Sequence, residues 1–234
     1  MKHLFLVLIV FVFIQKGITQ DSCQPFFPIA SGYMWEYEEF DKKDELTGTN
    51  STAVESIRLE GENVVYTLKA VSDGPKKKEK NHYENTFTYT CDHGVLKMSL
   101  ENMIPNETME GMKDMEMEIN QTEMIIPSQL NVGDKLDNAT INMKVSSNGM
   151  TIMNMTVTVS NRVVEKKESI TTDSGTYDCV VISYTTNTDM GIVKRTGSGR
   201  EWFSPIAGLV KSETYDKNGA LEYKRVLKSF STGS

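Results

Sequence analysis

The C-terminal quarter of the chain consists of short segments rich in Val, Ile, Tyr, Thr and Phe, each bounded by Gly, Asn, Asp or Pro. These segments lie in residues 175–186, 191–215 and 216–230. Runs of such residues between turn residues are typical of β-strands rather than helices. No part of the chain shows the sustained 3.6-residue apolar period of an amphipathic helix. The sequence therefore predicts an all-β fold.

The preceding part of the chain repeats this pattern. In residues 33–40, for example, Trp35 and Tyr37 alternate with glutamates, as in a strand with one buried and one solvent-exposed face. Residues 115–126 are predicted to form one strand, and residues 139–146 and 150–164 a hairpin around an Asn-Gly turn. About twelve strands joined by short turns predict an antiparallel meander that closes into a barrel or half-barrel, or divides into two sheets.

The first 19 residues have the features of an export signal. Lys2 precedes the apolar run 4–14, which is too short to span a bilayer about 30 Å thick. Small residues then allow cleavage before Gln20. Acylation of Cys23 is the alternative, but the polar residues before it fit a lipoprotein cleavage site poorly. We therefore predict a signal peptide over residues 1–19.

Residues 20–234 are predicted to form a single β-barrel-like domain, located in the periplasm or at the cell surface. This part of the chain has no apolar run long enough for a membrane helix. The chain has 32 acidic and 25 basic residues, a formal net charge of −7. Because such a surface repels phosphate backbones, nucleic acid is not an expected partner, and the charge is interpreted as a contribution to solubility.

Three cysteines would be present in an oxidising compartment, so they cannot all pair within the chain. Cys179 lies within an apolar strand pattern and fits a buried thiol. Cys23 precedes the first predicted strand and Cys91 ends another, both near turns. We predict a disulfide between Cys23 and Cys91 that restrains the N-terminal segment.

Several short stretches of the chain carry a resemblance to a known family. They are residues 23–28, the turn 132–136, and residues 161–164, 175–179 and 201–213 (EWFSPIAGLVKSE), the last being the most specific. Together they resemble the TapB-like family of secreted bacterial proteins. The resemblance implies an antiparallel β-barrel with a YmcC-like fold, similar to half-barrels that carry lipids or lipoproteins in the periplasm. The family is uncharacterised and brings no catalytic motif.

The residues themselves argue against an enzyme. After the predicted signal peptide, the only histidines are His82 and His93, both in loop-like settings. The chain has no His-Glu-x-x-His, no Gly-x-Ser-x-Gly and no phosphate-binding glycine loop. We therefore expect a non-catalytic protein that requires no cofactor and no metal ion.

Methionine is the most unevenly distributed residue. Of 14 methionines, eleven lie between Met98 and Met155. Met115 and Met117, like Met153 and Met155, are two residues apart in predicted strands, so each pair lies on one face. Because Met is flexible and apolar, these four side chains are candidates to line an apolar cavity. Plain core packing and a Cu(I) site with thioether ligands are the alternatives.

Trp35 and Trp202 complete the candidate cavity, although either tryptophan also fits a core or barrel-end position. The predicted role is non-catalytic binding of a hydrophobic ligand (a lipid, acyl chain or peptide) or of an envelope protein. The alternative is a structural envelope or matrix component without a ligand cavity.

Overall fold

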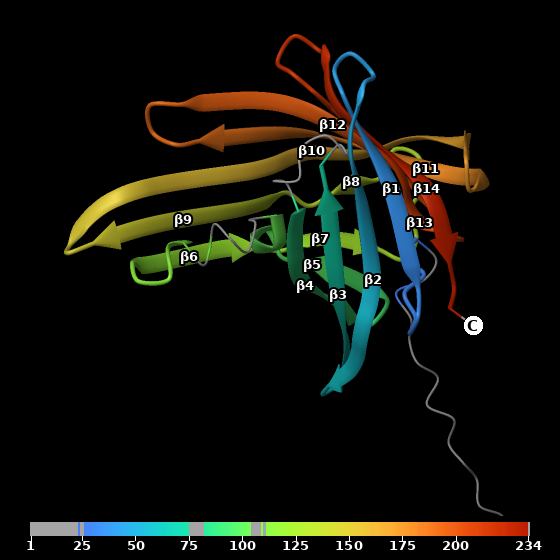
Figure 1. The fold of residues 1–234 in the computed structure, drawn as a ribbon, viewed down its shortest axis with the longest axis horizontal. Helices are drawn as coiled ribbons and strands as arrows, with labels where there is room; N and C mark the ends of the chain where they lie inside the picture. The colour runs from blue at the N-terminus through green and yellow to red at the C-terminus, as the bar shows by residue number, and fades with distance from the viewer. Residues whose placement is uncertain (1–22, 24–25, 75–81, 104–108, 110, 234) are drawn as a thin grey trace, which may run out of the picture.

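The computed structural model describes residues 23, 26–74, 82–103, 109 and 111–233, so the predicted signal peptide lies outside the described residues. The described part forms one 14-stranded sheet, which curls into a nearly closed antiparallel barrel (Figure 1). The all-β, antiparallel fold predicted from the sequence is confirmed. Among the described residues, no helix reaches the length and hydropathy needed to cross a membrane.

The strands are, in chain order, β1 (Met34–Asp41), β2 (Leu46–Glu60), β3 (Asn63–Asp73), β4 (His82–Asp92), β5 (Val95–Met98), β6 (Glu116–Thr122), β7 (Met124–Pro127), β8 (Lys135–Leu136), β9 (Ala139–Ser147), β10 (Met150–Thr172), β11 (Gly175–Asp189), β12 (Lys194–Ser204), β13 (Gly208–Tyr215) and β14 (Leu221–Ser231). A short 3-10 helix, η1 (Leu100–Met103), follows β5. Neighbouring strands follow the order β6-β9-β10-β11-β12-β13-β14-β1-β2-β3-β4-β5-β7, and β8 pairs with β10.

The prediction of a single strand over residues 115–126 is wrong, and the difference explains how the barrel closes. The chain leaves β6 at Thr122 and enters β7 at Met124. β6 pairs with β9 at one edge of the sheet, whereas β7 pairs with β5 at the other edge. The polar residues 120–123 interrupt the apolar alternation at this point. A single residue, Glu123, therefore connects the two edges of the sheet.

Arg162 adds a second link between the two parts of the sheet. Its guanidinium is buried and donates hydrogen bonds from Nη1 to the carbonyls of Ile125 in β7 (3.0 Å) and Asp137 after β8 (2.8 Å). The neighbouring Asn161 has a φ of 53° and lies where the pairing of β10 with β11 is irregular. Arg162 on β10 thus satisfies one backbone acceptor of the edge strand β7 and one of the segment after β8.

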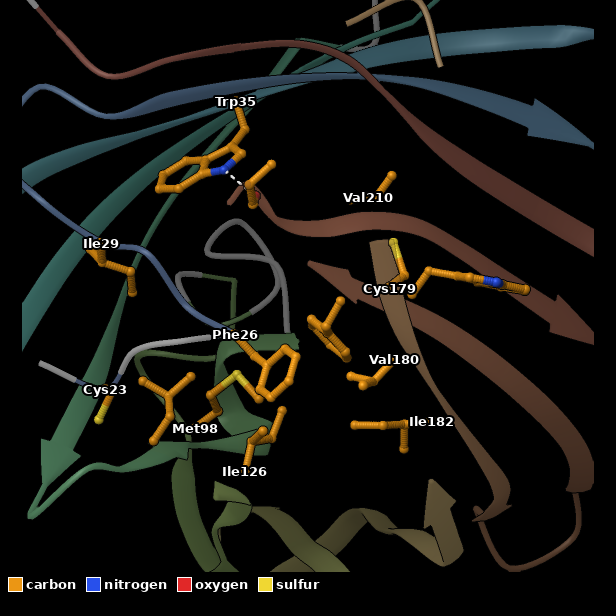
Figure 2. Close-up of a cluster of buried hydrophobic side chains, with 14 of the residues drawn as sticks. Cys23, Phe26, Ile29, Trp35, Met98, Ile126, Cys179, Val180, Ile182 and Val210 are labelled. Carbon is orange, nitrogen blue, oxygen red and sulfur yellow. Dashed lines mark hydrogen bonds between the residues drawn. The ribbon is translucent and has the colours of Figure 1, made fainter. Parts of the chain in front are cut away.

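The main hydrophobic core fills the barrel around Trp35 and the N-terminal lead-in. Figure 2 shows side chains of Phe26, Met98 and Ile126 converging with those of Val180 and Ile182. Because these residues come from distant parts of the chain, the core is built by strand order rather than by local sequence.

Cysteine pairing agrees with the expectation from the sequence. Cys23, the residue considered for acylation, forms a disulfide with Cys91 of β4, with a Cα–Cα distance of 5.6 Å. The bond attaches the lead-in to the sheet. Cys179 is free and buried, and burial raises the pKa of its thiol to about 12. This thiol therefore behaves as a small apolar side chain.

Candidate binding surface on the inner face of the sheet

Methionines from three adjacent strands gather on the inner face of the barrel. Across β6, β9 and β10, Met117 is level with Val145 and Met153, and the next row contains Ile119, Met143 and Met155. We call these six residues the methionine strip. Its central residues on β9 are buried, whereas its flanking methionines on β6 and β10 remain partly exposed. The result is an apolar surface with a covered centre and accessible sides.

The methionine strip continues toward the barrel interior. Farther along β9 and β10, Ile141 and Val159 belong to a second apolar cluster with Leu100 of η1. Met124 of β7 and Tyr184 of β11 pack against this cluster. Apolar contact therefore runs from the strip to the junction of the two sheet edges.

The structure separates the six residues predicted to share a cavity. Met117, Met153 and Met155 lie in the strip, while Met115 precedes β6 with 36% of its surface exposed. The other strip residues were not predicted, although the alternation in residues 139–146 marks Met143 and its neighbours as one face of a strand.

Neither tryptophan belongs to the methionine strip. Trp35 lies in the main core, stacks on Phe230 with ring centroids 5.6 Å apart, and donates its indole N–H to the carbonyl of Ala207 at 2.7 Å. Trp202 donates to Glu168 Oε1 at 2.6 Å, and the ammonium of Lys211 lies 4.5 Å from its ring centroid. Both rings are buried and have structural partners, which accounts for their positions without a ligand.

A row of charged side chains crosses the inner face near the main core. Register pairs Glu39 of β1 with Arg225 of β14, Arg225 with Ser212 of β13, and Ser212 with Glu201 of β12. Arg225 Nη2 donates to Glu39 Oε1 at 2.7 Å, and Nε donates to the Tyr223 hydroxyl at 3.1 Å. We call Glu39, Tyr223, Arg225 and Glu201 the polar centre.

Glu201 is the unusual member of the polar centre. Loss of hydration raises the pKa of its carboxyl to about 7, against the opposing effects of Arg162 and Arg225. Within the described residues, no hydrogen bond or ion pair reaches this carboxylate, and the side chain keeps partial contact with solvent. Burial and the Glu201 charge together raise the pKa of Tyr89 to about 12. A carboxyl that titrates near neutral pH can donate or accept a hydrogen bond to a bound molecule.

A separate hollow of about 370 Å³ lies beside β10, β11 and β12. Most of its lining side chains are polar, and none of the six predicted cavity residues takes part. The residues are Asn161, Ser183, Tyr184, Thr185, Ser198, Gly199, Arg200, Tyr215 and Gly219. It is therefore not the cavity predicted from the methionines.

Both described histidines lie at exposed positions beside carboxylates. His82 Nδ1 is 2.7 Å from Asp73 Oδ1, and His93 Nδ1 is 2.6 Å from Asp92 Oδ1. In the part of the chain that the structure describes, no three His, Cys, Asp or Glu residues are grouped so as to hold a metal ion.

The fold places the chain in the class of nearly closed antiparallel β-barrels. A family model described as DUF3108-like matches residues 30–227, so the chain belongs to the DUF3108-like family. This match does not confirm the resemblance to the TapB-like family that the sequence suggested. No curated protein matches the chain.

Two solved structures share the fold. A candidate exported protein with a YmcC-like fold from Bacteroides fragilis is 20% identical, with a TM-score of 0.67 over 88% of this chain and 99% of that chain. A candidate lipoprotein from Parabacteroides distasonis is 25% identical, with a TM-score of 0.68 over 90% of this chain and 100% of that chain. The expected likeness to a YmcC-like fold is therefore confirmed.

Proposed function

We propose that the protein is an exported, non-catalytic binding protein for a lipid or another molecule with an acyl chain, and that the methionine strip holds the apolar part of this ligand. The observation that carries the proposal is the strip itself. Flexible thioether side chains from β6 and β10 flank a buried centre and remain partly exposed. Such a surface can adapt to chains of different length and shape.

The polar centre supports an amphiphilic ligand rather than a pure hydrocarbon. Tyr184 contacts the apolar cluster that continues the strip, and the charges of Glu201 and Arg162 both influence its hydroxyl. The inner face therefore changes from apolar to charged along its length. A head group with hydrogen-bonding atoms would find a partner in the unpaired Glu201 carboxyl.

An envelope location agrees with this proposal. The two structural relatives are described as a candidate exported protein and a candidate lipoprotein. The predicted signal peptide and the disulfide between Cys23 and Cys91 both suit an oxidising compartment outside the cytoplasm. We place the protein in the periplasm or at the cell surface.

The first test is recovery of the protein from its native envelope, followed by native mass spectrometry. A bound lipid or acyl chain is the expected result. A fluorescent fatty acid then measures affinity for the double variant M153Q/M155Q, which makes two strip residues polar at nearly constant length. We expect at least a tenfold loss of affinity.

Met150→Gln is the matched control, because Met150 begins the same strand, is 71% exposed and lies outside the strip. It should bind the fatty acid like the wild type. If the wild type carries no lipid and binds no fatty acid, a structural envelope component becomes the better interpretation. Equal losses in the control and the double variant would remove the strip from the proposal.

A further inference from the structure

The hairpin tip between β11 and β12 exposes a cluster of large apolar side chains. Met190 and Val193 are 41% and 48% exposed, and Ile192 is completely exposed at 101%. We call residues 190–193 the apolar tip. None of its side chains belongs to either hydrophobic cluster of the described residues.

Other described hairpin tips are built differently. The β12–β13 turn exposes a single large apolar residue, Ile206, beside Pro205. The turn residues of the remaining tips are polar, charged or small, at 42–45, 61–62, 93–94, 148–149, 173–174 and 216–220. Directly after the β9–β10 turn, Met150 and Ile152 are 71% and 60% exposed, but they belong to β10 and not to the turn. Three exposed apolar side chains within four residues are therefore a local exception.

Turn geometry does not account for this composition. Gly191 has a φ of 80°, and its N–H donates to Asp189 Oδ1 at 2.8 Å. Met190 N–H donates to the carbonyl of Val193 at 2.9 Å. The turn thus uses a glycine, the carboxylate of Asp189 and a backbone hydrogen bond, and polar side chains at the other tip positions would satisfy it equally well.

We propose that the apolar tip inserts into the surface of a lipid bilayer. Three side chains offer roughly 300–400 Å² of apolar contact, whereas each partner in a standard protein interface buries about 800 Å². The tip is therefore too small to form such an interface alone. Insertion among lipid head groups buries the same side chains without requiring a complementary surface.

The flanking charges suit this position. Lys194 and Arg195 follow the tip directly, and both are exposed. Lys194 forms an ion pair with Asp189 at 2.8 Å, while Arg195 has no ion-pair partner among the described residues. Cations behind an inserted apolar tip meet the phosphate layer of the bilayer. Because the formal net charge is −7, apolar insertion rather than attraction to anionic lipid must supply most of the binding.

The tip also lies close to the methionine strip. Asp189 at the end of β11 pairs with Thr156, the residue after Met155 of the strip. Figure 1 shows the orange β11–β12 hairpin extending toward the same side of the molecule as the yellow β9–β10 hairpin. A bilayer at the tip would therefore face the end of the barrel that carries the strip.

Flotation of the full mature chain with vesicles tests the proposal. We expect binding to phosphatidylcholine vesicles, no strong gain when half of the lipid is phosphatidylglycerol, and persistence at high salt. The double variant I192S/V193S should reduce the bound fraction at least tenfold. Ile206→Ser removes an exposed isoleucine from the turn at the opposite end of β12 and should bind like the wild type.

Circular dichroism should be unchanged in both variants, because Ile192, Val193 and Ile206 belong to neither hydrophobic cluster of the described residues. Fatty-acid binding of I192S/V193S is a separate readout, which tests the ligand proposed above independently of the tip. Equal flotation of wild type and I192S/V193S would overturn membrane insertion. Absence of flotation together with a wild-type dimer that I192S/V193S dissociates would also overturn it, in favour of a second copy of this chain.

Discussion

The inner face of the barrel has two apolar ends that are built from different side chains. At one end, Trp35 stacks on Phe230, and Phe27 and Tyr89 make further ring contacts. The disulfide of Cys23 holds the lead-in against this end. At the other end, the methionine strip combines a buried centre with partly exposed side chains. We call the two regions the aromatic end and the methionine end.

The difference separates fixed packing from adaptable packing. Aromatic rings have few rotamers and prefer defined contact geometries, so the aromatic end specifies one arrangement. Methionine has three rotatable side-chain bonds and fits irregular surfaces. The aromatic end is therefore expected to stabilise the fold, and the methionine end to tolerate change and accept a ligand.

The largest expected effect comes from the aromatic end. Trp35→Ala removes a buried ring and the hydrogen bond to the carbonyl of Ala207, so it should lower the free energy of unfolding by about 4 kcal/mol. Met155→Ala removes a partly exposed side chain at the methionine end and should cost about 1 kcal/mol or less. Urea unfolding of the oxidised proteins, followed by circular dichroism, measures both. Similar losses would contradict the distinction between the two ends.

The closure of the barrel between the two ends depends on Arg162. Arg162→Met keeps most of the side-chain volume but leaves the carbonyls of Ile125 and Asp137 without this donor, so we expect a loss of about 2–3 kcal/mol. Amide exchange in β7 should accelerate. The control is Arg200→Met, which removes an ion pair to Glu165 whose side chains are 41% and 34% exposed. It should cost less than about 1 kcal/mol, and an equal cost would argue against a closing role for Arg162.

Strands could be predicted from the sequence because their signals are local. The hairpin around residues 148–149 is an example, since an Asn-Gly turn between alternating segments determines β9 and β10. The separation of β6 from β7 could not be predicted in this way. It depends on which distant strand each segment pairs with, and the polar residues 120–123 resemble an ordinary strand interruption.

The candidate site was predictable to a similar, limited extent. Spacing placed Met153 and Met155 on one face, but an irregularity between Thr151 and Met153 sets which residues of β9 they meet. No local pattern in the sequence predicts the polar centre. Glu39 lies among other glutamates in the sequence, and its ion-pair partner Arg225 is 186 residues away.

The polar centre gives the smallest predicted effect, and it depends on pH. Burial raises the pKa of Glu201 from its ordinary value of 4.5 to about 7, so the folded state binds a proton more tightly than the unfolded state. The contribution of the Glu201 carboxyl to the free energy of unfolding therefore falls as pH rises from about 4.5 to 7. Glu201→Gln cannot ionise, so relative to wild type it should gain about 1–2 kcal/mol across that window, given the partial exposure of Glu201.

Glu168→Gln is the control, because its effect on stability should change with pH in the opposite direction. The Trp202 indole and Lys166 hold the pKa of Glu168 below its usual range, so its carboxylate contributes stability that is lost as pH falls. The Glu168→Gln variant should therefore lose stability relative to wild type as pH rises. Urea unfolding of the three proteins at several pH values measures both slopes. If the Glu201→Gln difference is independent of pH between 4.5 and 7, then Glu201 is hydrated like a surface carboxylate, and it cannot supply the proton-sensitive contact expected at the polar centre.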